Sequence, residues 1–373
     1  MQFSTGGRLI HPIHELADIL QKIVSDWLSK PNESGLDEAI DKTISEGFFE
    51  KSDVDHALNN LSLSVQRNEI IEWVFRNTDV QKSYSEIIIK NRTRKILCLH
   101  AGNLPLVGLQ DMLAVLVSGV QYCGKVSRKD PYLIPSLLRY IQTQSSAFNI
   151  KFSLDIRDFR DELIEEWMFA GSEDSLESLK STLEKNSVIS TIHRSLIRIA
   201  HFSVAVIDQW DSKICADLIE SIFRYGGKGC RSVAVVYSYF KLNELSKELI
   251  VESSKWIQQN GYPIRIAPAV QLRSAYNEAI GINQVQVGNA LFQEGLVTID
   301  DPGIIYWQPL INPNDVNSQF GHHLQQVYYV PVRNEIDFKF VDNLKFDTLQ
   351  NAQSPPIWWQ PDGIDVLKWI LSK

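Results

Sequence analysis

Hydrophobic residues along this chain fall in short runs that alternate with polar turns. Residues 95–100 and 120–125 are apolar enough to be strands, and residues 107–119 between them have helical spacing. This pattern predicts a buried βαβ unit, which is typical of an α/β fold. A third strand is predicted at residues 166–170, and after a turn a helix follows over residues 175–184.

The two ends of the chain have different patterns. Residues 15–28 and 52–63 are amphipathic, so the first ninety residues are expected to be largely helical. Repeated prolines predict loops at residues 308–321 and 346–356. Aromatic residues in the C-terminal third could line a tunnel for an acyl chain or belong to the core: Trp307, Tyr328, Tyr329, Trp358 and Trp359.

Composition narrows the class of protein. The length of 373 residues and the hydrophobic fraction of 44% predict a large core divided among two or three domains. A net charge of −8 argues against nucleic acid as the main partner. The apolar stretch at residues 96–122 contains Asn103, Gln110 and Asp111, which argues against a membrane span. Four cysteines without paired spacing and no signal-peptide pattern predict a cytoplasmic protein with free thiols.

One cysteine stands in an unusual setting. Residues 225–230, Tyr-Gly-Gly-Lys-Gly-Cys, form a glycine-rich turn between a helical run and a strand. Glycines often mark places where the backbone approaches another group closely. The strand predicted at residues 232–237 is apolar enough to be buried, so it would hold the turn on a rigid scaffold. Cys230 is therefore a candidate nucleophile; the alternative is an ordinary buried cysteine beside a flexible loop.

Polar residues follow the predicted strands. Asn103 comes after the first strand and Lys125 ends the second. The carboxyl ends of parallel strands form the edge where open sheets bind ligands. Gly171 and Ser172 follow the third strand and predict a helix cap, whose free N–H groups can hold a phosphate.

Four motifs together resemble the aldehyde dehydrogenase superfamily, and within it the fatty acyl-CoA reductases of the bacterial bioluminescence (LuxC) type. They are Ala-Gly-Asn-Leu-Pro-Leu-Val-Gly at 101–108, Lys-Val-Ser-Arg-Lys-Asp-Pro at 125–131, Phe-Ala-Gly-Ser at 169–172 and Gly-Gly-Lys-Gly-Cys at 226–230. Their order and separations are similar to the family's. The resemblance runs from about Arg94 to the end of the chain, with looser support at residues 275–277, 324–327 and 361–365.

The resemblance implies an α/β fold with two lobes, a Rossmann-like cofactor domain and an α/β catalytic domain, preceded by a helical region. The expected divisions are residues 1–90 for the helical region, 91–207 for the NADP-binding domain, 208–340 for the catalytic domain and 341–373 for a segment that could return to the cofactor lobe.

It also implies the chemistry. In the family the cysteine, here Cys230, attacks an acyl thioester, releases coenzyme A and holds the acyl group until a nicotinamide hydride reduces it to an aldehyde. Asn103 matches the asparagine that stabilises the oxyanion together with the backbone N–H of the cysteine. The alternative is that Asn103 only shapes its turn.

The cofactor is expected to be NADPH. The residues that the resemblance assigns to it are Lys125, Ser127, Arg128, Gly171 and Ser172. Relatives that use NAD often carry an acidic residue where this chain has Arg128. Arg128 with Lys125 would instead attract a 2′-phosphate. The alternative is that Arg128 and Lys129 are solvated surface charges.

One departure from the superfamily favours reduction. Its oxidising members have a glutamate that activates water, upstream of the cysteine. The matching position here is Arg198 or a near neighbour, and residues 198–207 contain no carboxylate. His201 in this stretch could assist proton transfer or be a structural histidine.

The expected function is NADPH-dependent reduction of a fatty acyl-CoA to a fatty aldehyde. Three alternatives remain: a short acyl-CoA or carrier-protein-bound substrate, an aldehyde-oxidising dehydrogenase, which the missing glutamate disfavours, and a catalytically silent nucleotide-binding or assembly protein. No metal is expected, because the pairs His322–His323 and His11/His14 lack further ligands. A homo-oligomer is compatible with the sequence.

Overall fold

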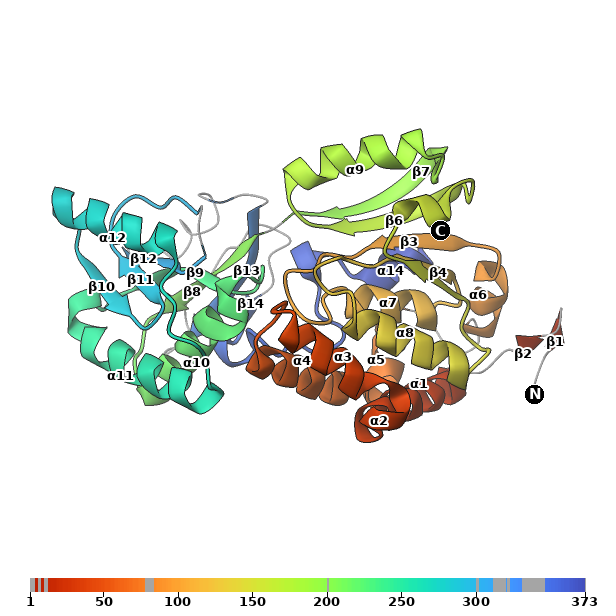
Figure 1. Cartoon of the computed structure of the whole chain (residues 1–373), viewed down its shortest axis with the longest axis horizontal. Helices are drawn as coiled ribbons and strands as arrows, with labels where there is room; N and C mark the ends of the chain where they lie inside the picture. Colours follow the sequence, from red (N-terminus) through yellow and green to blue (C-terminus); the bar gives the residue numbers. More distant parts are fainter. Residues whose placement is uncertain are drawn as a thin grey trace. The chain divides into compact units, whose positions relative to one another are not determined.

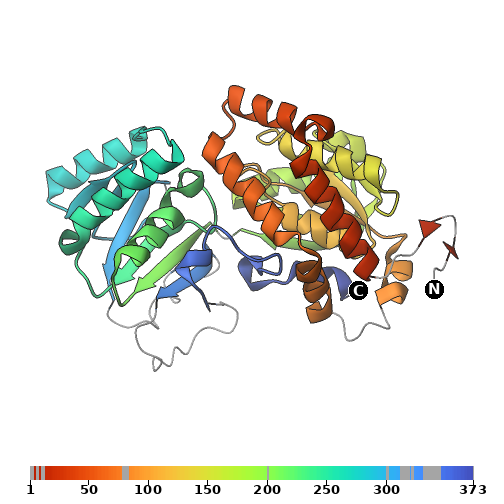
Figure 2. The same cartoon turned by 90° about the horizontal axis from the view of Figure 1, so that it is seen from below.

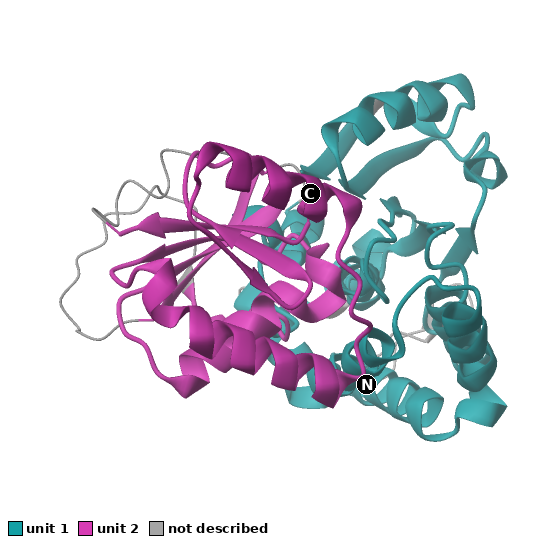
Figure 3. Cartoon of the chain, turned by 60° about the vertical axis from the view of Figure 1, so that its left-hand side comes forward, with its two compact units in different colours: residues 1–199, 356–373 teal, residues 200–355 magenta. Residues whose placement is uncertain are grey.

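The structure is a computed structural model of the chain and describes residues 4–5, 8–9, 13–77, 84–199, 201–299, 302–310, 320, 323–330 and 346–372. The chain divides into two compact units (Figure 3). Unit 1 is formed by Met1–Ile199 and Pro356–Lys373, and unit 2 by Ala200–Pro355. Both ends of the chain therefore contribute to unit 1.

Helices make up most of the N-terminal part of unit 1, as predicted. After a short antiparallel pair, β1 (Ser4–Thr5) and β2 (Arg8–Leu9), they are α1 (Ile13–Ser29), α2 (Pro31–Ser34), α3 (Leu36–Ser45), α4 (Lys51–Ser64), α5 (Arg67–Asn77) and α6 (Tyr84–Asn91). Leu16, Leu20 and Trp27 lie on one face of α1 and are buried. Trp27 Nε1 also donates a hydrogen bond to Ser136 Oγ, at 3.2 Å.

A five-stranded parallel sheet forms the centre of unit 1. Its strands are β3 (Lys95–Leu99), β4 (Gln121–Lys125), β5 (Ile150–Ser153), β6 (Ile164–Ala170) and β7 (Ile189–Arg198). Their spatial order is β5-β4-β3-β6-β7, and all neighbours are parallel. The order reverses between β3 and β6, so the sheet is doubly wound. The carboxyl ends of these two strands are where sheets of this kind bind ligands. The predicted Rossmann-like domain is confirmed.

Helices cover both faces of this sheet. They are α7 (Leu109–Val117), α8 (Leu133–Gln144) and α9 (Glu173–Lys185), with a 3-10 turn, η1 (Ile156–Phe159), before β6. Successive residues of a strand point to opposite faces. Accordingly Ile96 and Cys98 join the core that includes α1, α7 and α8, whereas Leu97 and Leu99 join a core that includes Leu183 of α9. Figure 1 shows α9 on one side of the sheet and the N-terminal helices on the other. Figure 2, seen from below, shows the N-terminal helices in front.

Unit 2 is built around a second sheet. Its seven strands are β8 (Phe202–Ile207), β9 (Val233–Ser238), β10 (Gln284–Val287), β11 (Ala290–Gln293), β12 (Ile304–Pro309), β13 (Leu324–Val330) and β14 (Phe346–Asp347). The order is β10-β11-β12-β9-β8-β13-β14, and only the β10–β11 pair is antiparallel. The described helical segments are α10 (Ser212–Phe223), η2 (Arg224–Gly227), α11 (Leu242–Asn260), α12 (Pro268–Ile280) and η4 (Leu349–Asn351).

The structure differs from the sequence-based expectations in one domain division and in one expected loop. β8 belongs to unit 2 because it pairs with β9 and β13, so the first division falls after Ile199 rather than after residue 207. The expected loop at 346–356 is wrong in part, since β14 pairs with β13 and η4 follows it. Most of the other expected loop, 308–321, lies outside the described residues, although β12 continues to Pro309.

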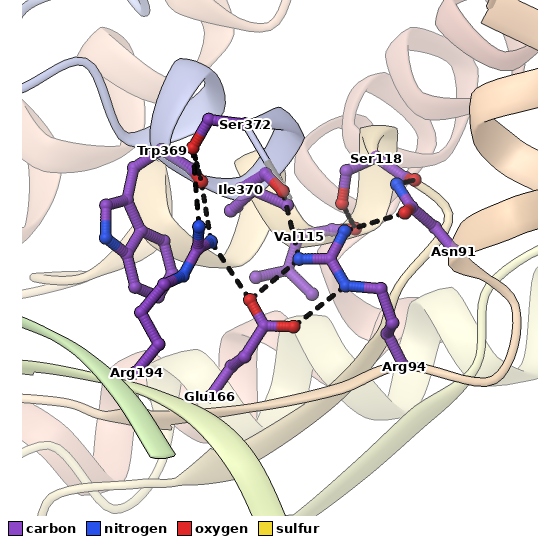
Figure 4. A network of polar contacts seen from close by, with 9 residues as sticks. All are labelled: Asn91, Arg94, Val115, Ser118, Glu166, Arg194, Trp369, Ile370 and Ser372. Atoms are coloured by element: carbon purple, nitrogen blue, oxygen red, sulfur yellow. Dashed lines mark hydrogen bonds and ion pairs between the residues drawn. The ribbon is translucent and has the colours of Figure 1, made fainter. Parts of the chain in front are cut away.

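The C-terminal residues of the chain pack in unit 1 as η5 (Pro361–Gly363) and α14 (Val366–Leu371). A buried carboxylate on β6, Glu166, accepts two hydrogen bonds from the guanidinium of Arg94, at 2.8 and 2.7 Å, and one from Arg194, at 3.0 Å. Arg94 also donates to Ile370 O and Arg194 to Trp369 O (Figure 4). The two arginines therefore link the sheet to backbone carbonyls in the last turn of α14.

None of the described helices combines the length and the apolar character needed to cross a membrane.

Candidate active site

The carboxyl ends of β3 and β4 carry the first group of predicted site residues. Asn103 is exposed in the turn after β3, and Lys125 ends β4. Gly102 packs tightly against Ser127, because a methyl group at Gly102 would lie 2.1 Å from Ser127 Oγ. Only glycine fits at that distance. The structure thus brings the turn of Asn103 against the segment that holds Lys125 and Ser127.

A buried carboxylate makes a second link between the same two segments. Asp130 is 2% exposed; its Oδ2 accepts the N–H of Leu106, at 3.0 Å, and its Oδ1 accepts the N–H of Leu133, at 3.2 Å. The Leu133 bond caps the first turn of α8. Burial raises the pKa of Asp130 to about 6. Leu106 has a φ of 58°, in the left-handed region that residues with side chains rarely adopt.

Lys125 and Arg128 place positive charge at this edge. Burial, and then the charge of Arg128, lower the pKa of Lys125. The negative charge of Asp155, in the turn after β5, partly offsets this lowering of the Lys125 pKa. The pKa of Asp155 is itself lowered, chiefly by its hydrogen bonds with Arg157 and in small part by Arg128. The edge therefore has two cations and one carboxylate, a set that can bind a phosphate or a ribose hydroxyl.

Gly171 and Ser172 form the turn after β6. Ser172 Oγ accepts the N–H of Ser175, at 3.4 Å, so Ser172 caps α9 as the sequence predicts. Gly171 N–H donates to Arg198 O at the end of β7, at 3.1 Å. Because β6 is the neighbour of β3, the N-terminus of α9 lies at the same edge of the sheet as the turn after β3.

A buried polar cluster lies beneath this edge. His100 follows β3, and its Nε2 is 2.5 Å from the hydroxyl of Tyr122. Burial lowers the pKa of His100 to about 4. Asp111 of α7 and Arg198 of β7 form a buried ion pair nearby. Arg198, which the resemblance places at or next to the position of the water-activating glutamate, is thus paired with Asp111.

Cys230 lies in unit 2, in the turn between η2 and β9, and is half-buried. Three consecutive residues before it, Tyr225, Gly226 and Gly227, have φ values of 59°, 61° and 72°. At Gly227 an added methyl group would also press to 3.2 Å from Ile222 O, so glycine is required there.

Hydrogen bonds hold the cysteine turn to the sheet of unit 2. Ser232 N–H donates to Gly229 O, at 2.9 Å, and the hydroxyl of Ser203 on β8 donates to Cys230 O, at 3.0 Å. The backbone of Cys230 is therefore fixed at the amino end of β8 and β9.

The other three cysteines are buried. Burial raises the pKa of Cys123 and of Cys215 to about 12 and raises that of Cys98 well above its usual value. A thiolate, which is the nucleophilic form, is disfavoured at all three positions. Cys230 is the one cysteine of the four with partial access to solvent.

The predicted site residues fall into two groups. Asn103 and the five cofactor-binding candidates lie along one edge of the unit 1 sheet, and Cys230 belongs to unit 2. His201 is exposed in unit 2, where its N–H donates to His323 O and the two rings stack with centroids 5.6 Å apart. Trp307 and Tyr328 are core residues of that unit, which favours the structural interpretation for these two.

Over the described residues, no group of three or more histidine, cysteine, aspartate or glutamate side chains is arranged to hold a metal ion. His11 and His322, which entered the metal hypothesis, lie outside those residues.

Three acidic residues were missed by the sequence analysis: Asp111, Asp130 and Asp155. Asp130 had a local signal, because an aspartate followed by proline just before a helical run is typical of a helix start. Asp111 and Asp155 had none, since their roles depend on neighbours brought together by the sheet.

Comparison of the sequence with protein-family models gives no match, and comparison with curated proteins gives none either. Solved structures do match. Methylmalonate-semialdehyde dehydrogenase from Oceanimonas doudoroffii has a TM-score of 0.63 at 13% identity, over 93% of this chain and 79% of that one. Aldehyde dehydrogenase 21 from Physcomitrella patens, in complex with the reaction product succinate, has a TM-score of 0.60 at 12% identity, over 94% and 81%.

A Mycobacterium tuberculosis aldehyde dehydrogenase complexed with NAD+ has a TM-score of 0.57 at 11% identity, over 87% of this chain and 74% of that one. Structural matches at sequence identities this low establish the fold alone. The chain has the aldehyde dehydrogenase-like α/β fold, with a Rossmann-like parallel sheet in one unit and a second sheet in the other.

Proposed function

We propose that this protein reduces a fatty acyl-CoA to a fatty aldehyde with NADPH, through an acyl group held on Cys230. The observation that carries the proposal is the contrast among the four cysteines. Cys230 is half-buried on a turn fixed to the sheet, whereas the other three are buried and their thiols resist ionisation.

The first half of the reaction is acyl transfer. The Cys230 thiolate attacks the thioester carbonyl, a carbon–sulfur bond forms, and the carbonyl oxygen becomes an oxyanion. Collapse of this intermediate breaks the bond to coenzyme A, which leaves as a thiolate and takes up a proton. The oxyanion needs donors fixed in advance. Asn103, with the backbone N–H of Cys230, is the proposed donor pair, supported by the tight attachment of the Asn103 turn.

The cofactor would bind at the carboxyl edge of the unit 1 sheet. Two observations support this: the reversal of strand order between β3 and β6, and the cations Lys125 and Arg128 at the same edge. Ser127, Gly171 and Ser172 complete the proposed site, because Gly102 packs against the Ser127 side chain and Ser172 caps α9. The nicotinamide, when bound there, supplies the hydride that the acyl carbon accepts.

Discharge of the acyl group completes the proposed cycle. Once the acyl carbon is reduced, its oxyanion expels the Cys230 thiolate, the carbon–sulfur bond breaks and the aldehyde leaves. Water is the competing acceptor. The Arg198–Asp111 ion pair supports reduction, because Arg198 stands at or next to the position that the resemblance gives to the water-activating glutamate, and it is a buried, paired guanidinium.

Mass spectrometry of the intact protein tests the proposal. Mixing with palmitoyl-CoA in the absence of NADPH should add one palmitoyl group to the wild type and to Cys215→Ala, and none to Cys230→Ala. An adduct that persists in Cys230→Ala would contradict the assignment. NADPH binding without any adduct would instead favour the silent nucleotide-binding protein.

The acyl donor is a separate question with the same readout. We expect long-chain acyl-CoA to acylate faster than acetyl-CoA or butyryl-CoA. Faster reaction of a short acyl-CoA, or of an acyl carrier protein, would replace the fatty acyl-CoA assignment and keep the reductase chemistry.

A further inference from the structure

Asn103 lies between two points at which its turn is fixed to the segment after β4. On one side, Gly102 packs against Ser127 Oγ. On the other, the N–H of Leu106 is held by the carboxylate of Asp130. Both points lie within unit 1.

The second point holds a conformation that the chain would not favour alone. Leu106 is in the left-handed region, with a φ of 58°, and its side chain is buried. That region is unfavourable for a residue with a β-carbon. A carboxylate that accepts a backbone N–H binds it more strongly than a neutral acceptor does. The hydrogen bond from Leu106 to Asp130 therefore opposes relaxation of the turn.

We propose that Asp130 is a positioning residue, whose carboxylate holds the turn so that the Asn103 side chain meets the reacting carbonyl. The inference rests on the proposed function. Asp130 is almost fully buried and both of its oxygens accept backbone N–H groups, so it acts through Leu106 rather than on the substrate.

The rival interpretation is that Asp130 only caps α8. The two roles use different atoms, since Oδ1 accepts the N–H of Leu133 in α8 and Oδ2 accepts the N–H of Leu106 in the turn. A residue that only caps α8 would change stability when replaced, and would leave acylation by saturating substrate unchanged.

The variant Asp130→Asn has one acceptor oxygen and can keep only one of the two bonds. Hydrogen exchange of the Leu106 and Leu133 amides shows which bond is lost, and the proposal concerns the loss at Leu106. Where the Leu106 bond is lost, hydrogen exchange of the Leu106 amide should become faster by about tenfold or more. This is the change in the opening equilibrium expected when one such hydrogen bond is removed. The rate of Cys230 acylation at saturating palmitoyl-CoA should also fall by about tenfold, less than the roughly 10²-fold loss expected for Asn103→Ala. KM should stay within about twofold, because the bond is not to the substrate.

Asp365→Asn is the matched control. Asp365 caps α14 in the same unit, where it accepts the N–H of Lys368 at 3.0 Å. Its replacement removes the same charge and should alter neither the Leu106 exchange nor the acylation rate. If Asp130→Asn does not fold, Asp130→Ser, which retains a capping oxygen, takes its place.

Faster exchange at Leu106 with an unchanged acylation rate would overturn the proposal, and so would slower acylation with unchanged exchange at Leu106. If the wild type acylates no cysteine, the proposed function fails and the catalytic role of Asp130 fails with it. A normal wild-type adduct with no effect of Asp130→Asn removes the positioning role alone.

Discussion

Burial shifts the pKa values of two side chains near the carboxyl edge of the unit 1 sheet in opposite directions. Burial lowers the pKa of His100 to about 4, so the fold favours its neutral form. The contribution of His100 to stability is complete above its unfolded pKa, about 6.5, and is lost as the pH falls toward 4. Burial raises the pKa of Asp130 to about 6, so the fold favours the protonated acid. That contribution is complete below about pH 3.8 and is lost as the pH rises through 6.

When one of the two groups is replaced, the pH dependence of the free energy of unfolding that remains should be that of the other group. His100→Gln retains Asp130, so its free energy of unfolding should fall between pH 4 and pH 6. Asp130→Asn retains His100, so its free energy of unfolding should rise over the same range. The prediction concerns the difference between the two variants. Each contribution is at most about 3 kcal/mol, from 1.36 kcal/mol per pKa unit. Urea unfolding at several pH values measures the difference between the variants, in which contributions from other groups cancel. Parallel pH profiles would mean that neither residue titrates in this way.

Arg128 gives a prediction about cofactor choice. Arg128→Glu should weaken NADPH binding far more than NADH binding, by about tenfold or more, because it replaces an ionic hydrogen bond to the 2′-phosphate with a repulsion. Titration of protein fluorescence with each cofactor measures both affinities. Lys180→Glu, an exposed position on α9, serves as the charge control. Equal losses for NADPH and NADH would remove Arg128 from the phosphate site.

The charges at this edge show what local sequence can predict. Lys125 and Arg128 are three residues apart, so their shared location follows from the strand end alone. Asp155 follows another strand, β5, and reaches the pair only because β5 pairs with β4. A carboxylate from a different segment thus lies near the two cations.

Individual strands were predicted to within a few residues, because apolar runs bounded by turns are local signals. β3, β4 and β9 each begin and end close to the predicted positions. Which sheet a strand joins is not a local property. β8 reads as one more apolar run, and its place in unit 2 depends on pairing with β13, far along the chain.

The attachment of α14 to the sheet depends on Glu166. Glu166→Gln should leave the guanidinium groups of Arg94 and Arg194 without their buried counter-charge, and should destabilise the protein by about 3–5 kcal/mol. Hydrogen exchange within α14 should increase together with the fall in the thermal unfolding temperature. Glu165→Gln, at the exposed neighbouring position on β6, should change stability by less than about 0.5 kcal/mol. An equal effect of the two variants would show that the network does not hold α14.

For the protein as a whole, the resemblance to aldehyde dehydrogenases predicted an architecture that the motifs alone could not. The order of the five strands in unit 1, with its reversal between β3 and β6, and the second sheet agree with it. The position of the proposed nucleophile would not follow from general rules. Ligands are expected at the carboxyl ends of parallel strands, yet Cys230 lies at the amino end of β9.

The proposed enzyme should keep its acyl group when no reductant is present. Without a positioned base, attack of water on the Cys230 thioester lacks the roughly 10²–10⁴-fold assistance that such a base gives. The isolated adduct should therefore persist, and added NADPH should release aldehyde. The lifetime of the adduct and the ratio of aldehyde to acid are measured together over time. Hydrolysis within seconds would point to a water-activating residue and to an oxidising or thioesterase-like enzyme.

The packing of α14 in unit 1 affects the order in which the chain folds during its synthesis. Unit 2 is one continuous segment, Ala200–Pro355, and all of it precedes α14. The partners of Arg94 and Arg194 in α14 therefore emerge from the ribosome after an entire second unit has been made. Until then the arginine–glutamate cluster lacks the helix that covers it. A nascent chain should thus complete unit 2 before α14 packs into unit 1, with an exposed surface for chaperones in the interval.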